Sequence, residues 1–164
     1  MFQAGGNSDE GLFDYLHMEL VSTLLQPERN PGIHLSISTM EHLGFSSGYR
    51  LVERLTREWP RFKDELDSMK FICKEFWTAV FRKQVDNLRT NRQGVYVLQD
   101  NRFRHLAKVS TSGQYMEAAP KLVVFTCGLV RGALANLGIV SVVTAEVSAM
   151  PICKFQVQIQ RASA

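Results

Sequence analysis

The chain has 164 residues, 45% of them hydrophobic and 21% charged, with a formal net charge of +3. These values are typical of one globular domain that is large enough to bury a core without disulfides or metals. No apolar run reaches the roughly 18 residues of a membrane span, and the first residues lack the basic and apolar parts of a leader, so we expect a cytoplasmic protein.

The first predicted helix is apolar around most of its circumference. Residues 1–8 are predicted to be a flexible tail, followed by a single domain over residues 9–161 whose first helix spans residues 9–26. The polar side chains of this helix fill one sector roughly 60° wide, with a few breaks elsewhere, whereas a surface helix needs an apolar stripe of little more than 100°. The helix is therefore either central within the domain or part of an oligomer interface.

Two more helices are predicted before the middle of the chain. Ser38 and Glu41 form a capping-box pattern, S-x-x-E, which predicts the start of a second helix that runs to about Trp59. A third helix is predicted from Asp64 to about Lys83, because acidic residues in a first turn favour the helix dipole.

The third helix is predicted to turn one broad apolar face toward a sheet. That face consists of Leu66, Met69, Ile72, Cys73, Phe76, Trp77 and Val80. Phe71 lies on the opposite side of an ideal helix, where it is either a lone exposed aromatic residue or part of a second contact.

The periodicity changes after Gly94. VYVLQ and RFRHLAK are predicted to be two strands joined by a tight turn at Asp100 and Asn101. A fourth helix is predicted over residues 114–137, and VSVVTAEV and CKFQVQIQ are predicted to be the last two strands. The element order is α-α-α-β-β-α-β-β. We therefore expect an α+β fold with four helices packed on one face of a four-stranded antiparallel sheet.

The fourth helix contains the stretch FTCGLVRGALANLG, which we interpret as a packing surface. Gly128 and Gly132 lie four residues apart and allow another backbone to approach closely. Gly44 and Gly48 in the second helix are interpreted in the same way. Arg131 lies on another side of the fourth helix and needs water or an acidic partner.

The sequence predicts no catalytic, cofactor or metal site. There is no phosphate-binding loop or dinucleotide fingerprint, and the histidines lack metal-ligand spacing. The cysteines form no CxxC pair, lie in apolar segments and are interpreted as core thiols in a reducing compartment. These dispersed residues are His17, His34, His42 and His105, and Cys73, Cys127 and Cys153.

Basic residues gather between residues 82 and 108, which hold seven bases and two acids. A solvated face, an acidic membrane surface or an acidic protein would each explain this stretch. Aromatic residues do not interleave with the bases as they do in single-strand binders, so nucleic acid is not expected as a partner. The candidate basic surface comprises Arg82, Lys83, Arg89, Arg92, Arg102 and Arg104.

Long segments of the chain resemble a known family. FTCGLVRGALANLG with SVVTAEVSAMPICKFQVQI is similar to the C-terminal half of the small helix-and-sheet subunits of the transport protein particle, TRAPP. DELDSMKFICKEFW and DNLRTNRQGVYVLQDNRF narrow this resemblance to the subunit 6 branch. The resemblance spans about residues 12–160.

The resemblance implies a non-catalytic structural subunit without cofactor that pairs through its first two helices with the sister subunit 3. It further implies contact with other TRAPP subunits, an indirect link to a Rab GTPase, and membrane contact only through the complex. The implied location is peripheral at the cis-Golgi and endoplasmic reticulum, in ER-to-Golgi vesicle transport. Candidate contacts, whose assignment to core or interface is open, are Phe13, Leu16, Leu20 and Leu24 in the first helix and Met40, Leu43, Leu51 and Leu55 in the second.

One departure from the family concerns lipid. In the acylated sister subunit, a cysteine just before the third helix carries an acyl chain that fills a hydrophobic tunnel. Here that stretch reads TREWPRFKDEL, with Phe62 near the corresponding place. We therefore expect no acylation at that site and a tunnel filled by side chains. The alternative function is a lipid-binding module with an internal hydrophobic pocket.

Overall fold

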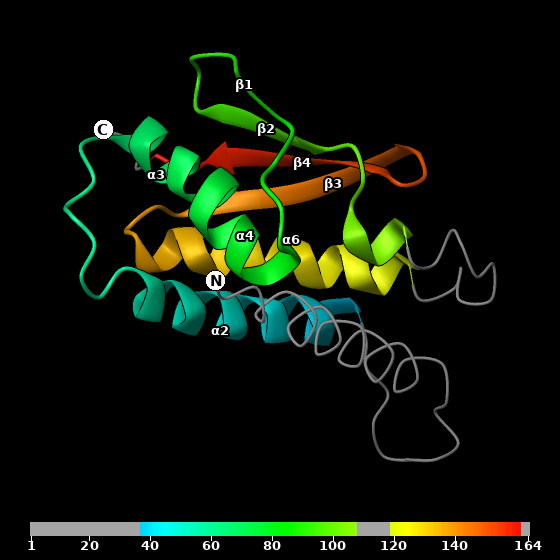
Figure 1. Cartoon of the computed structure of the whole chain (residues 1–164), viewed down its shortest axis with the longest axis horizontal. Coiled ribbons are helices and arrows are strands. Elements are labelled where there is room, and N and C mark those ends of the chain that lie inside the picture. The colour runs from blue at the N-terminus through cyan, green and yellow to red at the C-terminus, as the bar shows by residue number, and fades with distance from the viewer. Residues whose placement is uncertain (1–36, 108–118, 162–164) are drawn as a thin grey trace, which may run out of the picture.

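The computed structural model describes residues 37–107 and 119–161, in which helices cover one face of a four-stranded antiparallel sheet (Figure 1). The strand order is β1-β2-β4-β3, so the last two strands in the sequence lie beside the first two. The strands are β1 (Asn87–Thr90), β2 (Val95–Asp100), β3 (Ser141–Ala149) and β4 (Ile152–Ile159). The predicted α+β fold is confirmed, while the predicted tail and first helix lie outside the described residues.

The burial pattern of strand β4 shows that one face of the sheet is covered and the other is not. Cys153, Phe155 and Val157 are fully buried, whereas Gln156 and Gln158 between and beyond them are exposed. Successive side chains of a strand point to opposite faces, so this alternation requires one covered and one uncovered face. The last predicted strand is therefore confirmed, with its apolar side toward the helices.

A helical segment from residue 65 to residue 81 covers part of the inner face. It consists of α3 (Glu65–Phe71), the π-helix η2 (Ile72–Phe76) and α4 (Trp77–Phe81). Asp64 caps its start, because its side chain accepts a hydrogen bond of 2.8 Å from the backbone N–H of Asp67. Trp77 reaches the sheet, with its ring centroid 5.4 Å from that of Phe155.

The π-helical turn changes which residues of this segment are buried. Phe71 is only 4% exposed, and its ring contacts those of Trp59 and Phe62 at centroid distances of 5.0 and 5.3 Å. It therefore forms a second contact. Leu66 was predicted on the apolar face but is 37% exposed. A π turn holds more residues than an α turn, so an ideal helical period drawn through this segment assigns the wrong face to residues before η2.

The predicted hairpin between VYVLQ and RFRHLAK is wrong, because β2 pairs with the preceding strand β1 instead. The turn is built on Asn91, whose side-chain Oδ1 accepts hydrogen bonds from the N–H groups of Gln93 and Val95 at 2.9 and 3.3 Å. Arg92 and Gly94 adopt positive φ angles of 62° and 83°. Asparagine and glycine favour such a turn, and this signal lies one strand earlier than predicted.

The RFRHLAK segment begins a helical turn over residues 104–107 rather than a strand. The N–H of Ala107 donates to the carbonyl of Phe103 at 2.8 Å. Phe103 is fully buried and its ring lies 5.1 Å from that of Phe81 and 5.3 Å from that of Phe155. Phe103 therefore fills the core beyond the end of β2, and residues 104–107 do not extend the sheet.

Helix α2 (Ile37–Leu55) forms a second layer on α6 (Ala119–Asn136), which lies between α2 and the sheet (Figure 1). Ser38 lies inside α2, so the predicted capping box does not define its start. The helix also ends before Trp59, because the N–H of Trp59 bonds to the carbonyl of Thr56 at 3.0 Å in a turn. The predicted fourth helix is confirmed as α6 within the described residues.

Four glycines bring the backbones of α2 and α6 into direct contact. A Cβ atom on Gly44 or Gly48 would lie 2.1 or 2.0 Å from a carbonyl oxygen of α6. A Cβ atom on Gly128 or Gly132 would lie 2.2 or 2.0 Å from a carbonyl oxygen of α2. These distances are far below van der Waals contact, so the close-packing interpretation of all four glycines is confirmed.

We expect Gly48→Ala to destabilise the fold by about 1–3 kcal/mol, because the new methyl group meets the backbone of Leu129 rather than a movable side chain. The free energy of unfolding from urea denaturation measures this effect. Ser47→Ala, at an exposed neighbouring position, is the matched control and should change stability by less than about 0.5 kcal/mol. A Gly48→Ala variant more stable than the parent, as expected in an uncrowded helix, would contradict the contact.

A buried carboxylate ties the end of α4 to the sheet. Asp100 is fully buried and accepts hydrogen bonds from the Trp77 indole at 2.8 Å, the Lys83 ammonium at 2.5 Å and the Arg102 N–H at 3.0 Å. Lys83 also bonds to Asp86 at 2.8 Å. Each charge therefore has partners, which a buried carboxylate requires. Asp100 lies next to the turn at residues 101–102 and takes part in it through the Arg102 N–H, and it is also a structural anchor.

This cluster makes folding stability depend on pH in two windows. The Lys83 hydrogen bond holds the pKa of Asp86 below its ordinary 3.8, although partial burial opposes the shift. Burial lowers the pKa of Lys83, but its hydrogen bonds to Asp100 and Asp86 outweigh burial and raise that pKa above 10.5. Stability from Asp86 is therefore lost as pH falls below 3.8, and stability from Lys83 is lost as pH rises above 10.5.

We expect Lys83→Met to lower the free energy of unfolding by about 3 kcal/mol near neutral pH, because it leaves Asp100 buried without its cation. The alkaline loss of stability should also shrink in this variant. Urea denaturation across pH measures both effects, with Lys70→Met at an exposed position as the matched control. Equal stability of the two variants at neutral pH would show that the ion pair is not needed.

Candidate partner interface

The predicted interface residues of the second helix lie close to the glycine contact on α2, and most of them are covered. Leu43 is 43% exposed, Leu51 and Leu55 are half-buried against the core, and Met40 is fully buried. At 100° per residue these four positions share an arc of about 120°. Gly44 falls inside this arc, so the arc turns largely toward α6, and Leu43 at its outer end is the accessible member. The predicted residues of the first helix lie outside the described residues.

A second flank of α2 carries a contact that the sequence predicts only in part. The guanidinium of Arg131 on α6 lies 4.3 Å from the ring centroid of Phe45, and its Nε lies 3.0 Å from Glu41 Oε1. Tyr49, 42% exposed, stacks on Phe45 at 6.2 Å. Glu41 is the acidic partner that Arg131 was predicted to need. The i, i+4, i+8 spacing of Glu41, Phe45 and Tyr49 was the available signal for this flank.

The candidate basic residues lie in two groups rather than on one continuous strip. One group, at the ends of α4 and β2, comprises Arg82, Lys83, Arg102 and Arg104. Lys83 is engaged with Asp86 and Asp100, and Arg104 donates to the carbonyl of Phe81 at 3.3 Å. The other group, Arg89 and Arg92, lies on β1 and its turn. The basic stretch remains a prediction as a binding surface.

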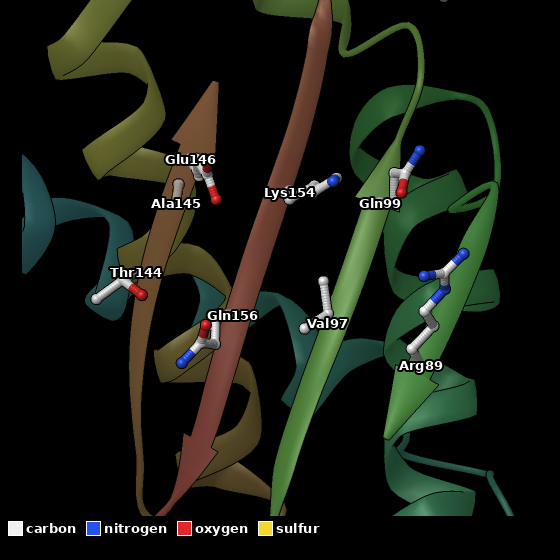
Figure 2. A pocket seen from close by; sticks show the side chains of 8 residues that line it. All are labelled: Arg89, Val97, Gln99, Thr144, Ala145, Glu146, Lys154 and Gln156. Carbon is white, nitrogen blue, oxygen red and sulfur yellow. The ribbon is translucent and has the colours of Figure 1, made fainter. Parts of the chain in front are cut away.

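The uncovered face of the sheet holds an open polar groove of about 370 Å³ (Figure 2). Its walls come from all four strands, and the helices lie behind it (Figure 2). Arg89, Val97, Gln156 and Thr144 are consecutive partners in one row across the sheet, and Gln99, Lys154 and Glu146 form the next. Both rows mix charged and neutral polar groups, so the groove suits a polar partner rather than an acyl chain.

The cysteines of the described part of the chain lack the surroundings of reactive thiols. Its three cysteines are buried and unpaired, and burial raises the thiol pKa of Cys73, Cys127 and Cys153 to about 12. Such thiols are protonated at neutral pH and are poor nucleophiles. Within residues 37–107 and 119–161, no three His, Cys, Asp or Glu side chains come together as metal ligands. None of the described helices combines the length and apolar character needed to cross a membrane.

Comparison with known proteins gives a family match over nearly the whole chain. Residues 13–160 match the model of the transport protein particle (TRAPP) component family. Trafficking protein particle complex subunit 6b of Danio rerio is 58% identical over 155 residues, which cover 94% of this chain and 99% of that protein. Subunit 6A of Homo sapiens is 53% identical over 157 residues, with the same two coverages.

A solved structure shares the fold at low sequence identity. The crystal structure of a trafficking protein particle complex subunit 3 from Naegleria fowleri, covalently bound to palmitic acid, aligns with a TM-score of 0.70 and 13% identity. The alignment covers 93% of this chain and 97% of that chain. The arrangement of helices on one face of the sheet is therefore common to both proteins.

Proposed function

This chain belongs to the TRAPP component family, in its subunit 6 branch, and we propose that it is a non-catalytic assembly subunit that pairs with TRAPP subunit 3. The pairing surface comprises α2 and the predicted first helix. Through this pair the chain would join the other TRAPP subunits in a tether that activates a Rab GTPase. It would act in ER-to-Golgi vesicle transport, peripherally at the cis-Golgi and endoplasmic reticulum.

The observation that carries the proposal is the way α2 is held. Its backbone lies against that of α6, so the helix cannot shift without breaking the four-glycine contact. Its accessible side nevertheless displays apolar residues, with Leu43 43% exposed. A rigid helix with exposed apolar side chains is suited to a permanent protein interface, because little order is lost on binding. An obligate pair would bury upwards of about 2,000 Å².

We expect Leu43→Arg to weaken pairing with subunit 3 by at least about tenfold, because it places a charge in an apolar contact. The melting temperature should stay near that of the parent, since Leu43 is not needed for the core. Binding of the purified full chain to subunit 3 can be measured by isothermal titration calorimetry. Leu20→Arg in the predicted first helix should have the same effect.

His42→Arg is the matched control for Leu43→Arg. His42 is exposed on the same turn of α2 but lies about 100° around the helix from Leu43. The His42→Arg substitution adds the same charge to the same turn and should leave the affinity for subunit 3 unchanged. Equal affinity of Leu43→Arg and the parent chain for subunit 3 would contradict the interface assignment.

The lipid-binding alternative predicts a bound acyl chain, whereas we expect none at the position of Phe62. Its ring is packed edge-on against Phe71 at 5.3 Å and carries no nucleophile. Intact mass spectrometry of the chain purified from eukaryotic cells should therefore give the unmodified mass, unchanged by hydroxylamine. A hydroxylamine-sensitive acyl adduct would contradict this expectation and favour the lipid-binding module.

A further inference from the structure

We propose that the free edge of β3 is a second interaction surface, which binds an extended segment of another protein as a fifth strand of the sheet. The segment would carry alternating β-branched residues and a basic residue beside Glu146. This surface is separate from the α2 surface, because α6 lies between α2 and the sheet (Figure 1). The proposal concerns a different partner and stands independently of pairing through α2.

The hydrogen-bond pattern identifies the backbone groups at this edge. The N–H of Gln160 donates to the carbonyl of Val140 at 2.8 Å, so these residues form a hydrogen-bonded pair in the β3–β4 ladder. In an antiparallel ladder such pairs alternate with pairs whose backbone groups point away from each other. From the register, the N–H and C=O groups of Val143 and Ala145 must therefore point away from β4. Among the described residues they have no hydrogen-bond partner.

The two edges of the sheet differ in how they are protected. Strand β1 has four residues and ends in the turn with Arg92, and a short edge with nearby charge discourages pairing. Strand β3 has nine residues, SVVTAEVSA, with no proline and no basic residue. Val142 and Val147 are 49% and 41% exposed along it. The register with β4 is irregular between Glu146 and Ala149, so the regular part of this edge, residues 141–146, is the template available for strand addition.

The charge on β3 favours a foreign strand over a second copy of this chain. Glu146 faces Lys154 in the register, but their charged groups form no ion pair. A strand added to β3 would place one residue directly opposite Glu146 on the uncovered face, where a basic side chain is favourable. Strand β3 contains no basic residue, so a second copy pairing through the same strand cannot provide one.

The polar groove adjoins this edge and extends the same surface. Thr144 and Glu146 of β3 form one of its walls, and Arg89 and Lys154 lie further across the sheet (Figure 2). Neither Arg89 nor Lys154 has an ion pair within the described ranges. A segment lying along β3 could therefore continue over the uncovered face and place an acidic side chain near these two cations. Main-chain bonds would supply affinity, and the groove would supply specificity.

The test uses the full chain and a defined probe, an eight-residue peptide of alternating valine and threonine with one central lysine. NMR titration should show saturable binding at peptide concentrations up to about 1 mM, with slowed hydrogen exchange at the amides of Val143 and Ala145. Val143→Pro should weaken binding by at least about tenfold. It removes an outward N–H that the ladder does not use, so the sheet should stay folded. Val143→Ala is the matched control for the lost side chain and should bind normally.

Charge reversal tests the predicted chemistry of the partner. A peptide with glutamate in place of lysine should bind the parent chain more weakly, and Glu146→Lys should invert this preference, with Glu146→Gln showing none. Absence of saturable binding, binding unaffected by Val143→Pro, or no protection of the two amides would overturn the proposal. Slow hydrogen exchange at these two amides without peptide, becoming slower as the protein concentration rises, would also overturn the proposal. Such a result would assign the edge to a second copy of this chain.

Discussion

The direct backbone contact between α2 and α6 is the constraint on which the rest of the structure depends. Each of its four glycines places a carbonyl oxygen of the facing helix where any side chain would need its Cβ atom. The contact therefore fixes the distance between the two helices rather than merely permitting it. Since α6 itself packs on the sheet, the position of α2 relative to the sheet is fixed as well. The exposed Leu43 side chain is thereby presented in one orientation.

A second interaction, a buried hydrogen-bond cluster, holds the helical segment of residues 65–81 to the sheet. Fully buried Asp100 joins the Trp77 indole and the Lys83 ammonium at the point where α4 ends and β2 finishes. Buried charge is costly, so this cluster is stable only when every partner is present. Together with the glycine contact it holds the two proposed surfaces, on α2 and at the edge of β3, in fixed positions relative to the sheet. If both proposed surfaces bind partners, one on α2 and one at the edge of the sheet, the chain is suited to a position inside a larger assembly.

Much of this fold could be predicted from the sequence because its signals are local. The alternation in CKFQVQIQ and the paired glycines of GFSSG and CGLVRG directly predicted a one-sided sheet and a close helix contact. The prediction of the first hairpin was wrong because two turn signals compete, one at residues 91–94 and one at residues 100–101. The sequence does not show that Asp100 is buried and bound to Lys83. The π turn at residues 72–76 displaced Leu66 and Phe71 from their predicted faces, since a helical period assumes a uniform pitch. The free edge of β3 depends on strand order, which periodicity does not determine.

The central claim is that this chain functions through assembly, and the mass of the purified protein tests it most directly. The full chain would be expressed alone and together with TRAPP subunit 3, and its mass would be measured by light scattering after gel filtration. We expect a stable 1:1 pair with subunit 3, and self-dimers or aggregates when the chain is alone. A well-behaved monomer that does not associate with subunit 3 would contradict the account.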